Sequence, residues 1–227
     1  MRLLTTITLI ILLLISCKEE KDPNKREIGQ MSDKESVEEQ AQKEDDIDWV
    51  AINTDEALVA TALMAAPKES REGCKVIGYN MAGEFVTFRE GTNEFIVLVD
   101  DSGRDGFSAA AYHKELDPFM ARGRELKAEG KSRQEIFDIR EEEIKSGKLQ
   151  MGPPGSTLHL YFGPNAQYDP ATSKVKGAIY RYVVYLPFAT SETTGLPEEP
   201  ISNNHPWIMD PGTHKAHIMI SPIPDTP

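Results

Sequence analysis

The sequence has few positive charges for its length. Its 227 residues include 25 Lys and Arg against 37 Asp and Glu, which gives a net charge of −12 at pH 7. Residues 49–227 hold 18 basic and 25 acidic residues, and no basic run alternates with aromatic residues. A nucleic-acid interface needs clustered Lys and Arg to neutralise phosphates. The composition therefore predicts no nucleic-acid partner.

Familiar catalytic motifs are also lacking. The chain contains no GxSxG nucleophile elbow, no GxxxxGK phosphate loop, no GxGxxG dinucleotide loop and no HExxH zinc motif. Carboxylates are abundant, but in so acidic a chain their pairing does not identify a glycosidase. The sequence therefore favours a binding or interaction module over a hydrolase, and it offers no catalytic residue.

Long hydrophobic runs are absent, apart from one near the N-terminus. Residues 3–15 follow Arg2 and are too few to span a bilayer comfortably as a helix, which is typical of a secretory signal. The tetrapeptide Leu14-Ile15-Ser16-Cys17 resembles the bacterial lipobox, in which the cysteine becomes the lipidated first residue of the mature chain. The resemblance implies that residues 1–16 are a signal peptide and that acyl chains on Cys17 anchor the protein in a membrane. An ordinary signal peptide and an uncleaved anchor are the alternatives.

The segment after Cys17 is acidic and contains no aromatic residue. Residues 18–48 hold 12 acidic and 6 basic residues, too little apolar surface to offset the entropy of ordering. Many lipoproteins that are retained in the inner membrane carry Asp after the lipidated cysteine, whereas this chain has Lys18, which favours delivery to the outer membrane. The segment CKEE resembles the surface-export signal of Bacteroidetes lipoproteins, and a plain acidic tether is the alternative. We expect a cell-envelope lipoprotein of the outer membrane, displayed on disordered residues 17–48, whose partner is an envelope protein or a small ligand.

A single globular domain is predicted for residues 49–227, beginning where Trp49 ends the acidic segment. This length suits one domain with a sizeable core. With Cys17 carrying lipid, Cys74 is the one remaining cysteine. We interpret it as a small buried residue at the start of a strand, with a reactive or intermolecular thiol as the alternative.

Hydrophobic periodicity predicts strands on both sides of a helical pair. Helices are expected at 54–66, 116–130 and 132–147, the second capped by Asp117 and the third opened by a capping box at Ser132. Strands are expected at 75–79, 84–89, 94–99, 157–162, 179–186 and 215–220. This order predicts an α+β fold: a single domain with a mainly antiparallel sheet, an N-terminal helix and a central αα-hairpin.

Three of the five histidines lie within the stretch HPWIMDPGTHKAH. Its Asp-Pro-Gly-Thr segment predicts a type II turn in a hairpin, with Met209 opposite His214. His205 and His214 then lie on one face about 13 Å apart, and His217 lies on the other face. We interpret the stretch as a polar, aromatic-flanked hairpin.

A metal site is the alternative for the same stretch. A looser loop would bring His205, Asp210, His214 and His217 around one ion, either zinc or another transition metal. The protein would then be a metal-dependent enzyme rather than a binding module without a cofactor.

A wider resemblance covers about residues 54–222. The segments FREGTNEFIVLVDD, ARGRELKAEGKS and YVVYLPFAT together are similar to a group of uncharacterised exported bacterial proteins, which share an Arg, a spacer and Gly-Thr-Asn ahead of a strand. No activity is assigned to that group, so the resemblance implies no catalytic residues. Here Gly91–Asn93 predicts a tight turn before the buried strand at 94–99.

Overall fold

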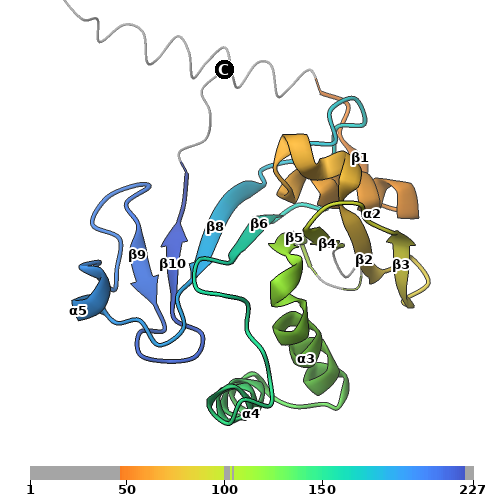
Figure 1. Cartoon of the computed structure of the whole chain (residues 1–227). Coiled ribbons are helices and arrows are strands. Elements are labelled where there is room, and N and C mark those ends of the chain that lie inside the picture. The colour runs from red at the N-terminus through yellow and green to blue at the C-terminus, as the bar shows by residue number, and fades with distance from the viewer. Residues whose placement is uncertain (1–46, 100–102, 104, 223–227) are drawn as a thin grey trace, which may run out of the picture. The chain divides into compact units, whose positions relative to one another are not determined.

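An eight-stranded sheet organises the structure, in the order β3-β2-β4-β5-β6-β8-β10-β9 (Figure 1). The computed structural model describes residues 47–99, 103 and 105–222. The strands of this sheet are β2 (Lys75–Tyr79), β3 (Phe85–Arg89), β4 (Phe95–Leu98), β5 (Phe107–His113), β6 (Thr157–Gly163), β8 (Ile179–Tyr185), β9 (Trp207–Met209) and β10 (His217–Ile220). Two further strands, β1 (Val50–Ala51) and β7 (Gln167–Tyr168), form a separate antiparallel pair. The helices are α2 (Asp55–Ala62), η1 (Leu63–Ala65), η2 (Lys68–Gly73), η3 (Lys114–Leu116), α3 (Asp117–Ala128), α4 (Arg133–Lys145) and α5 (Ser191–Thr194).

The predicted fold class is confirmed. Every neighbouring pair in the large sheet is antiparallel except β2 and β4, which are parallel. The helices α3 and α4 form the central αα-hairpin, and α2 is the N-terminal helix of the domain. No helix among the described residues is both long and apolar enough to cross a membrane. The predictions for residues 1–16, for Cys17 and for most of the tether lie outside the described residues.

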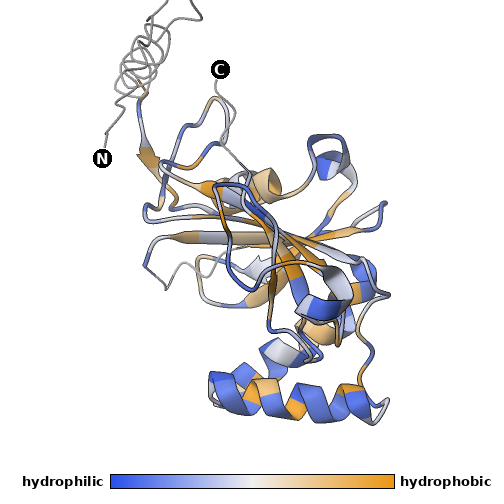
Figure 2. Cartoon of the chain, turned by 90° about the vertical axis from the view of Figure 1, so that its left-hand side faces the viewer, coloured by the Kyte–Doolittle hydropathy of each residue, from blue (hydrophilic) through white to orange (hydrophobic). Residues whose placement is uncertain are grey.

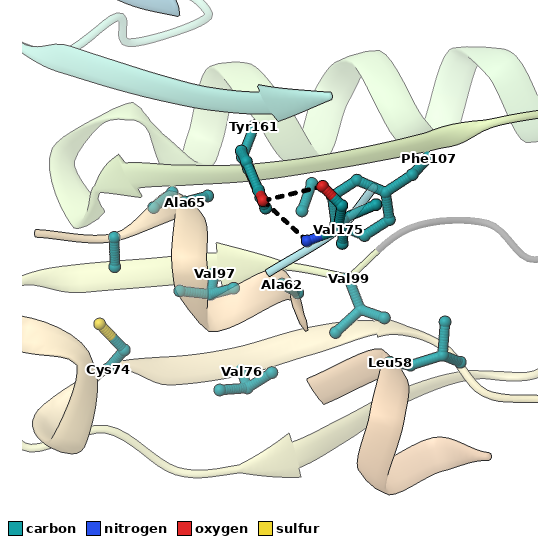
Figure 3. Close-up of a cluster of buried hydrophobic side chains, with 13 residues drawn as sticks. Leu58, Ala62, Ala65, Cys74, Val76, Val97, Val99, Phe107, Tyr161 and Val175 are labelled. Atoms are coloured by element: carbon teal, nitrogen blue, oxygen red, sulfur yellow. Dashed lines mark hydrogen bonds between the residues drawn. The ribbon is translucent and has the colours of Figure 1, made fainter. Parts of the chain in front are cut away.

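The sheet is covered on both faces, and each face has its own hydrophobic core. In β4, Val97 packs with Leu58 and Ala62 of α2, whereas its neighbour Ile96 packs with Phe119 of α3. Successive side chains of a strand point to opposite faces, so α2 covers one face and the αα-hairpin the other (Figure 1). Figure 3 shows the α2 core, where the Tyr161 hydroxyl accepts a hydrogen bond from the Val175 amide at 2.9 Å.

The helix starts agree with the predicted capping chemistry at α4 but not at α3. In α4 the Ser132 hydroxyl accepts from the Glu135 amide, and the Glu135 carboxylate accepts from the Ser132 amide, as a capping box requires. The expectation that Asp117 caps α3 is wrong, because η3 already turns into the helix and Leu116 is the N-cap residue. The Asp117 carboxylate instead accepts hydrogen bonds from the Tyr112 hydroxyl and from Arg124.

The Gly-Thr-Asn segment has a structural role at the start of the sheet. A Cβ on Gly91 would lie 2.4 Å from the backbone nitrogen of Lys75, so a larger residue does not fit there. The amides of Thr92 and Asn93 both donate to the Gly73 carbonyl, at 2.8 and 3.1 Å. Cys74, next to this junction, is fully buried as predicted.

Candidate ligand-binding cleft

The stretch HPWIMDPGTHKAH forms the predicted hairpin, but the predicted register is wrong. Met209 pairs with His217 rather than with His214. The predicted Asp210–Thr213 turn is present, with the Thr213 amide donating to the Asp210 carbonyl at 3.3 Å, but the connection extends beyond it to Ala216. It is also bonded to the segment after β8. The Gly212 amide donates to the Ala189 carbonyl, and the Phe188 amide donates to the Thr213 carbonyl, each at 2.7 Å. We call residues 210–216 the β9–β10 loop.

His214 lies in this loop and is fully buried, whereas the predicted hairpin register placed it on one face of the hairpin with His205. Its Nδ1 is 3.1 Å from a carboxylate oxygen of Glu141 in α4. Its ring lies edge-on between the rings of Phe119 and Phe137, with centroids 5.8 and 4.8 Å away. His214 therefore joins the β9–β10 loop to both helices of the αα-hairpin.

Of the other predicted metal ligands, His217 and Asp210 have partners of their own, whereas His205 has none at its Nδ1 among the described residues. His217 is buried against Tyr185, and its Nδ1 lies 2.8 Å from the Lys215 carbonyl. Asp210 forms an ion pair with Lys215 at 3.2 Å. His205 is half-buried, and its Nδ1 is buried without a hydrogen-bond partner.

A metal-binding arrangement of these residues has no support in their geometry. Across residues 47–99, 103 and 105–222, no group of three or more His, Cys, Asp or Glu side chains is placed to hold a metal ion. The transition-metal alternative at His205, Asp210, His214 and His217 stays a prediction, for which a rearranged loop would be needed.

A cleft of about 870 Å³ lies between the αα-hairpin and the β9–β10 loop. Its charged lining residues are Lys127, Lys131, Arg133, Arg140, Asp210 and Lys215, and its other lining residues are Gln134, Ile136 and Phe137. Lys127 comes from the end of α3, the residues from 133 to 140 from α4, and the last two charged residues from the loop. Three separate parts of the chain thus build one cavity.

The cleft carries an excess of positive charge on a strongly acidic chain. Five cations line it against a single carboxylate, that of Asp210, which is paired with Lys215. Lys131 forms an ion pair at 3.6 Å with Glu135, a residue that does not line the cleft. Lys127, Arg133 and Arg140 form no ion pair with a carboxylate of the described residues. These three cations are available to an anionic ligand.

Arg140 is held in position by Phe119. Its guanidinium carbon lies 4.0 Å from the centroid of the Phe119 ring, and one Nη donates to the Phe119 carbonyl at 3.3 Å. The Nε is buried and has no hydrogen-bond partner in the described structure. Burial lowers the pKa of Arg140, yet a guanidinium remains charged in proteins.

Tyr185 packs against Phe119 and does not itself line the cleft. It is buried on β8, 6.0 Å from Phe119, and the charges of Arg140 and Asp210 act on its hydroxyl. Burial raises the pKa of Tyr185 to about 12. The hydroxyl is therefore protonated throughout the physiological range.

A more acidic side of α4 lies next to the cleft and shares Phe137 with it. A smaller hollow of about 310 Å³ is lined there by Phe137, Asp138, Glu141, Glu142 and Lys145. Within it, Glu141 pairs with both His214 and Lys145. The α4 residues that line the cleft thus include Arg133 and Arg140 but no carboxylate, whereas the adjacent hollow is lined by three carboxylates and Lys145. Figure 2 shows α4 as a mainly hydrophilic helix with hydrophobic residues at intervals.

The sequence did not reveal the cleft, because its cations come from positions between 127 and 215. One signal was present in α4, where Arg133 and Arg140 flank Ile136 and Phe137 at helical spacing. Comparison of the chain with protein-family models, with curated proteins and with solved structures found no match in any of the three.

Proposed function

We propose that this protein is a lipid-anchored binding module of the bacterial cell envelope that holds a small anionic ligand in the cleft between the αα-hairpin and the β9–β10 loop. The observation that carries the proposal is the accumulation of five cations around one cavity, three of them without a carboxylate partner.

The chemistry of the lining supports an anionic ligand. Arginine donates in a planar fork that matches carboxylate and phosphate groups, and the cleft offers two such side chains, Arg133 and Arg140. A volume of about 870 Å³ lies within the range of roughly 300–1,000 Å³ that is usual for small-molecule sites. A protein partner would instead need a contact area of about 800 Å² on this chain.

Reversing the charge at the mouth of the cleft should weaken anion binding. Lys127 and Arg133 are both exposed, so Lys127→Glu with Arg133→Glu should leave the core intact. Each lost charge-assisted hydrogen bond is worth about 1.5–3 kcal/mol, so we expect at least a roughly tenfold loss of affinity for inorganic pyrophosphate by isothermal titration calorimetry.

The matched control for this variant has the same net charge. Lys68→Glu with Lys174→Glu changes two lysines that do not line the cleft. If both double variants lose affinity equally, pyrophosphate responds to overall charge and the cleft is not the site. Measurements in about 0.15 M salt restrict the comparison to nearby charges, because the Debye length is then about 8 Å.

The membrane anchor is supported by the Leu14–Cys17 motif behind a short apolar run. Replacing Cys17→Ala should abolish labelling by a radioactive fatty acid and move the protein from the membrane fraction to the soluble fraction of a bacterial host. A Cys74→Ala chain is the control, because that thiol is buried within the folded domain. Retention of the Cys17→Ala chain in the membrane pellet would contradict lipid anchoring.

A further inference from the structure

We propose that the ligand of the cleft is an elongated molecule with an anionic group at each end and an apolar middle, bound along α4 between Arg133 and Arg140. This inference rests on the proposed function, because it specifies the anion that the cationic cleft binds.

The spacing of the two arginines sets the length of the ligand. They are seven residues apart, which is nearly two full turns, so they lie on the same side of α4 about 10 Å apart along the axis. Both line the cleft, and neither is paired with a carboxylate of the described residues. A ligand held near both backbone positions would therefore be elongated along the helix.

The two ends of the segment from Arg133 to Arg140 differ in the cations around them. Lys127 and Lys131 line the cleft around the Arg133 end, where the αα-hairpin turns. At the other end, Lys215 is paired with Asp210, which also lines the cleft, so Arg140 is the cation there without a carboxylate partner among the described residues. Unpaired cations therefore lie at both ends of the cleft, with Lys127 and Arg133 at one end and Arg140 at the other.

The part of α4 between Arg133 and Arg140 that lines the cleft is apolar at Ile136 and Phe137. Ile136 and Phe137 follow Arg133 by three and four residues and precede Arg140 by four and three, so they lie between the arginines on the same side of α4. Both are only half-buried, and α4 has no fully buried residue. An apolar segment of a ligand would cover them, whereas a compact polyanion would leave them exposed to water.

A series of linear dicarboxylates measures the spacing directly. The protein is the mature chain, residues 17–227, carrying Cys17→Ala so that it remains in solution. Calorimetry is run with dicarboxylates from succinate to dodecanedioate and with the monocarboxylate of each chain length. Added methylenes strengthen the binding of any acid by burying apolar surface. The informative quantity is therefore the dissociation constant of the monocarboxylate divided by that of the dicarboxylate of equal length.

We expect this ratio to be near one for the short acids and to rise to at least tenfold near nonanedioate, whose extended carboxylates are about as far apart as two helical turns. Arg133→Gln should return the ratio to near one, because only one carboxylate would then find an arginine. Arg133 is exposed, so this variant should fold, and circular dichroism checks that it does. Lys68→Gln, away from the cleft, should leave the ratio unchanged.

The outcomes distinguish this inference from the proposed function. A ratio that does not depend on length, or tighter binding of pyrophosphate than of any dicarboxylate, would overturn the elongated ligand and leave the anion site standing. Failure of both pyrophosphate and the dicarboxylates to bind would overturn both proposals. An acidic peptide that binds more tightly than every dicarboxylate would replace the small molecule with a protein segment.

Discussion

Phe119→Ala should lower the free energy of unfolding by about 3–5 kcal/mol, the range typical for removal of a buried phenylalanine. Phe119 is only 1% exposed and contacts three parts of the fold. Its ring touches Tyr185 of β8 and His214 of the β9–β10 loop, and the Arg140 guanidinium lies against it. The substitution therefore leaves a cavity where the sheet, the loop and α4 meet.

The measurement is urea denaturation of the mature Cys17→Ala chain with and without the substitution. Phe119→Leu should lose less, because leucine fills most of the cavity although it offers no ring to Arg140. Ile201→Ala is the surface control, with a side chain 74% exposed, and should change stability by no more than about 0.5 kcal/mol. A loss below about 1 kcal/mol for Phe119→Ala would show that this ring does not organise the cleft.

His214→Ala should lower the free energy of unfolding by about 2–4 kcal/mol, because it removes a fully buried ring packed between two phenylalanines. The variant also loses the hydrogen bond to Glu141 that joins the loop to α4. The effect should therefore exceed that of an ordinary surface histidine, for which about 0.5 kcal/mol is usual.

Two comparisons separate packing from metal binding at His214. His214→Phe should recover much of the lost stability, because the buried Nε2 has no partner and an aromatic ring keeps the contacts. A chelator should leave the melting temperature of the unmutated chain unchanged. If the chelator lowers that temperature by several degrees and the histidine variants abolish the drop, the transition-metal site at His205, Asp210, His214 and His217 is correct.

The same histidine predicts how stability changes with pH. Burial lowers the pKa of His214, an effect strengthened by Arg140 and Lys215 and opposed by Glu141. Below about pH 6.5 the unfolded chain therefore binds the proton more readily than the folded chain, so the free energy of unfolding falls as the pH decreases. Burial also lowers the pKa of His159 and of His217.

Urea titrations between pH 7.5 and 5.5 should show this decrease, and it should be smaller in His214→Phe. The titration of Glu141 does not contribute to the change in stability over this pH range. Hydrogen bonds from Lys145 and His214 lower its pKa below 4.5, so its contribution is present above about pH 4.5 and is lost only at lower pH. An equal slope in the two chains would show that His214 titrates normally in the fold.

The elements of the fold were predictable because their signals are local. The capping box at Ser132 depends on two residues three positions apart, and the alternating core positions of a strand such as β4 follow from its period of two. Capping of α3 was predicted wrongly, because whether Asp117 caps or begins the helix depends on η3 and on side-chain contacts with Tyr112 and Arg124, five and seven residues away.

By itself, the sequence determined the α+β class, the αα-hairpin and the burial of Cys74. Periodicity and turn chemistry act within a few residues, and the fold follows from them. Only the tertiary structure decided that His214 is buried against Glu141, 73 positions away, rather than lying on one face of a hairpin with His205. The same long-range packing gathers Lys127, Arg140 and Lys215 around one cavity, since side chains so far apart in the chain meet only when the αα-hairpin packs against the β9–β10 loop.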